Sequence, residues 1–214
     1  MKNSHNDNIN AISKKAAGVR DEVKKDKNYI LNLIDKNLQK LSETEIKQKQ
    51  KKIEDQLFNF ANFRESLTAF LYTPISKEIP THKIIKTALQ VEKQIVLPVF
   101  SNKKKRISLF KITNLDKDLI TNADGILEPN IETCKKISIN DIDIAVIPGL
   151  AFDDKGGRIG LGLNFYNNLI LKLPETCRKI AIAFEEHIVN HITMESRKFA
   201  IDIVITDKRI IYKI

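Results

Sequence analysis

The chain has 214 residues, 42% of them apolar, and a formal net charge of +9 at pH 7. This predicts one globular domain, residues 27–214, behind a polar extension, residues 1–26. No window approaches the roughly 20 apolar residues of a membrane span, and no apolar signal segment follows the N-terminus, so we expect a cytoplasmic protein. The positive charge suits nucleic acid, an anionic ligand or only a lysine-rich surface. Because no nucleic-acid-binding module is recognisable, we favour a nucleotide or polyanionic small substrate.

Residues 1–26 are compatible with a loosely docked amphipathic helix or a disordered tail. Apolar spacing predicts a helix over residues 27–41, and Ser42 to Glu45 has the form of a capping box that begins a second helix. A further helix is expected from Thr81 to about Lys93. Strands are predicted over residues 67–72, 94–100, 107–112, 142–147, 179–184, 200–206 and 209–213.

The order of these elements predicts an α/β sheet with helices on both faces. The strands at 94–100 and 107–112 flank a basic turn and are expected to pair antiparallel, and the last two strands are expected to form a closing hairpin. Ligands of such sheets bind at the carboxyl ends of the parallel strands.

Glycine is concentrated at one such strand end. Five of the seven glycines of the chain fall between Gly149 and Gly162, after the apolar strand at 142–147 and before a helix predicted at 164–172. A strand, a glycine loop and a helix can direct backbone N–H groups at a phosphate, and Arg158 would add a charged fork of donors. The alternative is a long surface loop without a ligand.

Other chemistries are less well supported. The sequence contains no Walker A loop, no dinucleotide fingerprint and no readable Ser-His-Asp or Cys-His set. His187 and His191 have a spacing that could hold zinc on a helix, but no third ligand is evident, and ordinary histidines are favoured. Asp202, inside an apolar strand, either faces solvent or serves a magnesium or phosphate site. Glu78 alone reads as a surface residue.

The glycine stretch resembles the 5-formyltetrahydrofolate cyclo-ligase family. The family signature is Pro-Gly-x-x-Phe-Asp-x-x-Gly-x-Arg-Leu-Gly-x-Gly-x-Gly-Tyr-Tyr-Asp, and this chain has the same spacing from Pro148 to Tyr166. Further similar segments are Glu78 to Thr81, residues 125–129, 183–186 and 201–206. The resemblance covers about residues 27 to 212. It implies a three-layer α/β/α sandwich with a mostly parallel sheet and a helical N-terminal region, like that of the NagB/RpiA/CoA-transferase proteins.

The resemblance also implies an activity: the conversion of 5-formyltetrahydrofolate and ATP into 5,10-methenyltetrahydrofolate, ADP and phosphate, with Mg²⁺. It further implies a monomer that binds neither nucleic acid nor a membrane. Arg158 would be catalytic. Glu78, Phe165 and Tyr166 would meet the folate, and Asn167 and Asp202 the metal. The implied ATP-binding residues are Lys27, Gly157, Arg158, Ile159, Gly160, Leu161, Gly162, Leu163, Asn164, Phe165 and Tyr166.

The chain departs from the family pattern at several of these positions. Leu31 replaces an arginine, Asn164 a glycine, and Asn167 an aspartate whose charge would favour the metal. Leu161 and Leu163 stand where basic residues are common. Two alternatives to an active cyclo-ligase therefore stay open: an impaired family member that binds folate or nucleotide without efficient turnover, and a relative that acts on another substrate.

Overall fold

A computed structural model of the chain describes residues 26–101, 106–161, 165–194 and 196–213. Within these ranges the strands are β1 (Thr68–Phe70), β2 (Gln94–Ser101), β3 (Arg106–Ile112), β4 (Leu119–Thr121), β5 (Leu127–Pro129), β6 (Lys135–Ile137), β7 (Ile144–Val146), β8 (Ala151–Phe152), β9 (Arg158–Ile159), β10 (Arg178–Ile182), β11 (Ile203–Ile205) and β12 (Ile210–Tyr212). The α-helices are one of residues 26–38, α2 (Glu43–Asn59), α3 (Ala61–Glu65), α4 (His82–Gln90), α5 (Leu115–Asp118) and α6 (Phe165–Ile170). Short 3₁₀ turns lie at Ile139–Asp141, Glu185–His187 and Arg197–Phe199.

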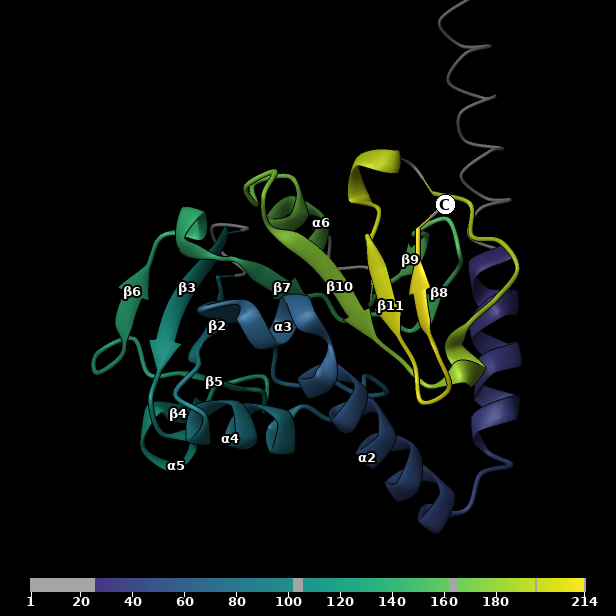
Figure 1. Cartoon of the computed structure of the whole chain (residues 1–214), viewed down its shortest axis with the longest axis horizontal. Helices are drawn as coiled ribbons and strands as arrows, with labels where there is room; N and C mark the ends of the chain where they lie inside the picture. Colours follow the sequence, from purple (N-terminus) through teal and green to yellow (C-terminus); the bar gives the residue numbers. More distant parts are fainter. Residues whose placement is uncertain (1–25, 102–105, 162–164, 195, 214) are drawn as a thin grey trace, which may run out of the picture.

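An eight-stranded sheet runs through the molecule in the order β12-β11-β10-β7-β1-β2-β3-β6 (Figure 1). The five strands β11, β10, β7, β1 and β2 are parallel. The edge pairs are antiparallel: β2 with β3, β3 with β6, and β11 with β12. The predicted mostly parallel sheet, the antiparallel pair after residue 94 and the closing hairpin are thus confirmed.

Helices cover both faces of this sheet because the central strands are apolar on both sides. In β1, Ala69 belongs to the core beneath α2, α3 and α4, whereas its neighbour Phe70 belongs to the core beneath α6. Figure 1 shows α2, α3 and α4 on the near face of the sheet. The predicted three-layer α/β/α sandwich is therefore confirmed.

The capping box at the start of α2 is formed as predicted. Ser42 Oγ accepts from the N–H of Glu45 at 3.2 Å, and Glu45 Oε2 accepts from the N–H of Ser42 at 2.8 Å. Ile53 and Leu57 then anchor α2 in the core. Thr81 does precede α4, but its hydroxyl does not cap the helix; it donates to the backbone oxygen of Tyr72 instead.

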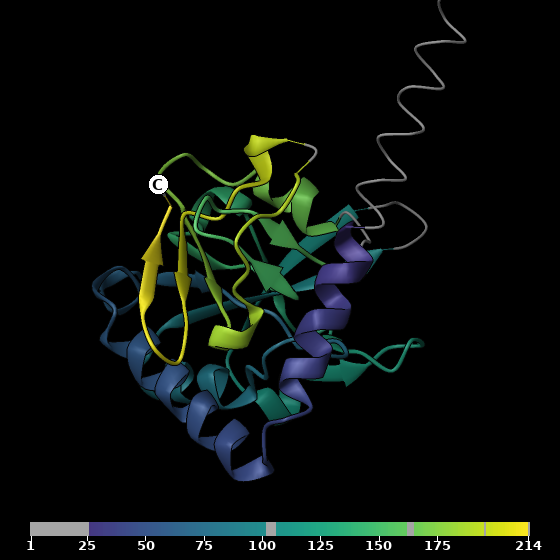
Figure 2. The ribbon, with the colours of Figure 1, turned by 90° about the vertical axis from the view of Figure 1, so that its right-hand side faces the viewer.

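The helix of residues 26–38, purple in Figure 1 and Figure 2, lies along one side of the molecule, next to β8 and β9. Ile34 forms a separate apolar cluster with Ala151, Ile159 and Ile192, and Leu31 packs against it. The helix is therefore held by β8, β9 and Ile192, and Leu38 at its end also packs against the main core. Among the described helices, none combines the length and the apolar character needed to cross a bilayer.

Several short elements were not predicted. The hairpin of β4 and β5, the edge strand β6 and the hairpin of β8 and β9 all fall in segments that we expected to be loops. Each has only two or three residues, and each is stabilised by a pairing partner more than by its own apolar pattern.

Candidate active site at the carboxyl edge of the sheet

The segments singled out by the sequence leave the sheet at one edge. β1 leads into the 71–80 loop with Glu78, and β7 leads into Pro148 at the start of the glycine-rich stretch. Because β1, β2 and β7 are parallel neighbours, their carboxyl ends lie together. Phe100 near the end of β2 contacts Phe165 of α6, with ring centroids 5.0 Å apart. This edge is the expected place for a ligand.

In the described part of the glycine-rich stretch, β8 and β9 form a hairpin and not the open cradle that we expected; residues 162–164, which lead to α6, lie outside the described residues. β8 and β9 pair antiparallel, and Asp153, only 2% exposed, ties their turn together. Asp153 Oδ1 accepts from the N–H groups of Lys155 and Gly157 at 3.0 and 2.6 Å, and its Oδ2 accepts from the N–H of Ile192 at 2.7 Å. The N–H of Gly157, expected to bind ATP, is therefore used inside the protein.

Two glycines of the hairpin are required by close approach. Gly156 has a φ of +78°, and a Cβ on it would lie 2.3 Å from the backbone oxygen of Ile201. A Cβ on Gly160 would lie 2.5 Å from Nη1 of Arg158. Gly160 thus leaves the space that the Arg158 guanidinium occupies.

Arg158 is held at both terminal nitrogens of its guanidinium. Its Nη1 donates to the backbone oxygen of Pro148 at 2.8 Å, and its Nη2 donates to Oδ1 of Asn167 at 2.6 Å. Nε is buried and has no hydrogen-bond partner among the described residues. Burial lowers the pKa of Arg158 to about 10, although nearby Tyr166 and Glu78 oppose that change. The guanidinium therefore keeps its charge at neutral pH.

Glu78 is buried rather than exposed, with 6% of its surface accessible. Its Oε2 accepts from the N–H of Ile75 at 2.9 Å. Burial raises the pKa of Glu78 to about 7, against the opposite effects of that hydrogen bond and of Arg158. The reading of Glu78 as a surface residue is therefore wrong, because the 71–80 loop folds back over the sheet edge.

Three aromatic side chains connect these groups. The rings of Phe100 and Tyr166 are 5.7 Å apart, and Tyr166 also contacts Phe70 of β1 at 6.4 Å. Burial raises the pKa of the Tyr166 hydroxyl well above its usual value. Phe165 and Tyr166 were expected at the site. Phe100 was missed, because an aromatic residue at the end of the apolar strand β2 looks like any other core residue in the sequence.

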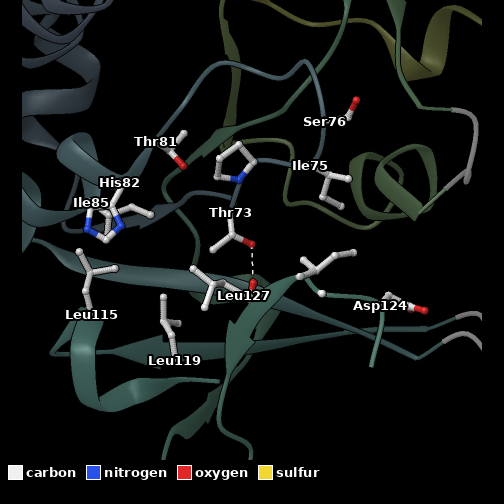
Figure 3. A pocket seen from close by; sticks show the side chains of 13 residues that line it. Thr73, Ile75, Ser76, Thr81, His82, Ile85, Leu115, Leu119, Asp124 and Leu127 are labelled. Atoms are coloured by element: carbon white, nitrogen blue, oxygen red, sulfur yellow. Dashed lines mark hydrogen bonds between the residues drawn. The ribbon is translucent and has the colours of Figure 1, made fainter. Parts of the chain in front are cut away.

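A cavity of about 400 Å³ lies between the 71–80 loop, the start of α4 and the β4–β5 hairpin (Figure 3). Its walls are mainly apolar: Leu115, Leu119 and Leu127 lie on one side, and Ile75 and Ile85 contribute from the loop and α4. Thr73 Oγ1 donates to the backbone oxygen of Leu127 at 2.6 Å and so joins loop to hairpin. Because Ile75 lines the cavity and its N–H binds Glu78, that carboxyl group lies behind the cavity wall.

Lys27 lies in the first turn of the N-terminal helix. Lys27 is half-buried in the helix of residues 26–38, which packs on Ala151 and Ile159. Leu31 is in the same apolar contact. The leucine at this position therefore has a packing role.

The remaining residues that were expected to bind ATP fall into three groups: buried, exposed and not described. Ile159 is 5% exposed, and its backbone oxygen accepts from the N–H of Leu150 at 2.7 Å, so it is part of the hairpin core. Leu161 is on the surface. Gly162, Leu163 and Asn164 lie outside the described residues.

Asn167 and Asp202 do not come together as a metal site. Asn167 is at the carboxyl edge and accepts from Arg158, whereas Asp202 precedes β11 at the opposite, amino edge. Asp202 binds Nζ of Lys179 and Lys213 at 3.1 and 3.6 Å. In the described part of the chain, no group of three or more potential metal ligands is found. These residues therefore do not fit the expected magnesium site.

His187 has an internal role, in line with the favoured interpretation. It is 2% exposed, and its Nδ1 accepts from the N–H of Phe184 at 3.1 Å. Its pKa is lowered to about 4 by burial. His191 is instead exposed, with Nδ1 4.0 Å from the Asp153 carboxylate.

Comparisons of the sequence agree with the resemblance. The sequence model of the 5-formyltetrahydrofolate cyclo-ligase family matches residues 13–207, and so begins inside the segment that we expected to be an extension. A probable 5-formyltetrahydrofolate cyclo-ligase of Schizosaccharomyces pombe is 28% identical over 203 residues, which cover 88% of this chain and 98% of the relative. A 5-formyltetrahydrofolate cyclo-ligase of Mycolicibacterium smegmatis is 26% identical over 144 residues, covering 66% of this chain and 74% of the relative.

Solved structures agree on the fold. The structure of a 5,10-methenyltetrahydrofolate synthetase of Aquifex aeolicus superposes with a TM-score of 0.74 at 24% identity, covering 87% of this chain and 92% of that one. A synthetase of the same name from Mycoplasma pneumoniae gives 0.65 at 20% identity, covering 85% and 99%. From the match over most of its length, the chain belongs to the 5-formyltetrahydrofolate cyclo-ligase family and is a ligase.

Proposed function

We propose that the chain converts 5-formyltetrahydrofolate to 5,10-methenyltetrahydrofolate at the carboxyl edge of the sheet, using ATP with Mg²⁺. The observation that carries this proposal is the cavity of about 400 Å³ beside the 71–80 loop that follows β1, with Ile75, whose N–H is bound by Glu78, in its wall. A mainly apolar cavity with a few polar groups in its wall is the usual form of a small-molecule site. Family membership supplies the substrate class.

The cavity between the 71–80 loop and the β4–β5 hairpin would take the folate. Its leucine and isoleucine walls suit the flat, poorly hydrated faces of a heterocycle. Glu78, with a pKa of about 7, can donate or accept a hydrogen bond at neutral pH, and it holds the N–H of Ile75 in the wall of this cavity. Phe165 and Tyr166 would cover the ring from α6.

Arg158 would serve the phosphoryl-transfer half of the reaction. The formyl oxygen attacks the γ-phosphorus and ADP leaves. N10 then attacks the activated carbon to close the ring and loses its proton, and phosphate leaves. Both steps place negative charge on phosphoryl oxygens, and a fixed guanidinium stabilises it without reorganising. Lys27, Gly160 and the residues up to Tyr166 would line the nucleotide. The described residues build no magnesium site of their own, so we assign the ion no protein ligand.

The direct test is the ATP-dependent rise in absorbance of the methenyl product. We expect turnover by the wild-type chain when 5-formyltetrahydrofolate, ATP and Mg²⁺ are all present, and none when ATP is left out. Arg158→Ala should lower kcat by about 100-fold or more, whereas the exposed neighbour Asn168→Ala should change it less than about twofold. Folate binding by calorimetry without any turnover would instead support an impaired family member.

A further inference from the structure

The contact between Asn167 and Arg158 has a role beyond packing. Asn167 lies in the first turn of α6, and Arg158 lies in β9, so their hydrogen bond of 2.6 Å joins the helix to the hairpin. Together with the bond to Pro148, it fixes both terminal nitrogens of the guanidinium. An arginine held at two points has one orientation, which is what a charge-stabilising group requires.

Asn167 is poorly placed to bind a cation. Its Oδ1 already accepts from a charged guanidinium nitrogen, and a metal ion on the same oxygen would lie next to that positive charge. Asp202, the other expected ligand, is bound to two lysines at the far edge of the sheet. The geometry thus argues against Asn167 as a metal ligand.

The amide also leaves the charge of Arg158 intact. In the described part of the chain, no ion pair involves Arg158, and its nearest acidic influence is Glu78. A carboxylate in place of the Asn167 amide would hold the same nitrogen but would neutralise the guanidinium. An amide oxygen supplies the geometry alone.

We propose that Asn167 is a positioning residue: it aims the Arg158 guanidinium at the triphosphate while leaving its charge free for the phosphoryl oxygens. This inference rests on the proposed function, because it needs a nucleotide at Arg158. The positioning role and the expected role as a metal ligand can be told apart by experiment. A positioning residue acts only while Arg158 is present, whereas a metal ligand acts with or without Arg158.

A double-mutant cycle separates the two roles. The variants are Asn167→Ala, Arg158→Ala and their combination, with Asn168→Ala as the control on the exposed side of the same helix turn. We expect Asn167→Ala to lower kcat/KM for ATP by about tenfold or more in the wild-type background, and by less than about twofold once Arg158 is absent. Equal losses in both backgrounds would overturn the proposal. If the wild-type chain shows no turnover, the same cycle is measured on ATP affinity by calorimetry, with the same two outcomes.

Asn167→Asp gives an independent test with a side chain of the same shape. We expect it to fold with an unchanged melting temperature, to raise the KM for ATP by about threefold or more through the lost positive charge, and to bind no Mg²⁺ alone in calorimetry. Asn168→Asp adds the same charge one residue along, and it should change neither the KM for ATP nor the binding of Mg²⁺. Tighter Mg²⁺ binding by Asn167→Asp, with a lower Mg²⁺ requirement, would identify a metal ligand and refute the positioning role.

Discussion

Replacing Glu78 by glutamine should change how the stability of the protein depends on pH. The folded chain holds this carboxyl group at a pKa of about 7, against 4.5 in the unfolded chain. Between those values the folded state binds more protons than the unfolded state, so the contribution of Glu78 to stability is complete below pH 4.5 and is lost as the pH rises through 7. The full interval corresponds to about 3 kcal/mol, of which about 2 kcal/mol is lost between pH 5 and 7.5.

The wild-type curve alone would not reveal this loss. The pKa of His187 falls from 6.5 to about 4 on burial, so its contribution grows as the pH rises from 4 to 6.5 and opposes that of Glu78. The informative quantity is therefore the difference between wild type and Glu78→Gln, which cancels the histidine.

Urea unfolding at pH 5 and pH 7.5 measures that difference. We expect the wild type to lose about 2 kcal/mol relative to Glu78→Gln over this interval. Glu132→Gln, at an exposed carboxylate, should follow the wild-type curve and serves as the control. A difference for Glu78→Gln that changes by less than about 0.5 kcal/mol would show that Glu78 is not desolvated, and would refute the reasoning.

Three further predictions concern the hairpin and the cavity. Asp153→Ala leaves buried N–H groups without an acceptor and should cost about 3 kcal/mol of unfolding free energy in urea titrations; a cost below about 1 kcal/mol would contradict the role given to Asp153. Gly160→Ala should displace the Arg158 guanidinium and lower kcat by about tenfold or more, and an unaltered kcat in steady-state kinetics would count against the close contact. Leu127→Trp should fill part of the cavity and raise the KM for folate by about tenfold with the KM for ATP unchanged, whereas Ile131→Trp, exposed outside the cavity, should change neither; equal effects of the two would remove the folate from this cavity.

The sheet could be predicted from the sequence because its strands carry their own signal. The central strands are continuous apolar runs, and the capping box fixes the start of α2 at Ser42. Strand β6 could not be predicted, since two of its three residues are lysines and its place comes from pairing with β3. The antiparallel order of β11 and β12 follows from their short turn.

The candidate site could be predicted in part. The glycine spacing drew attention to Arg158, whose role in the reaction stays a prediction, but the same glycines suggested an open phosphate loop where β8 and β9 form a hairpin. The hairpin depends on one buried carboxylate, Asp153, which accepts from the N–H groups of Lys155 and Gly157 in the turn and from that of the distant Ile192. Asp202 was expected at the ligand-binding edge of the sheet but lies at the opposite edge. The sequence does not show that Lys179 and Lys213 lie beside it there and pair with its carboxylate.

A crystal structure with 5-formyltetrahydrofolate and a non-hydrolysable ATP analogue tests the central claim most directly. We expect the pterin in the cavity between the 71–80 loop and the β4–β5 hairpin, and a phosphoryl oxygen within hydrogen-bonding distance of the Arg158 guanidinium. Nucleotide or folate bound at another face, with Arg158 still enclosed by Pro148 and Asn167 alone, would contradict the assignment.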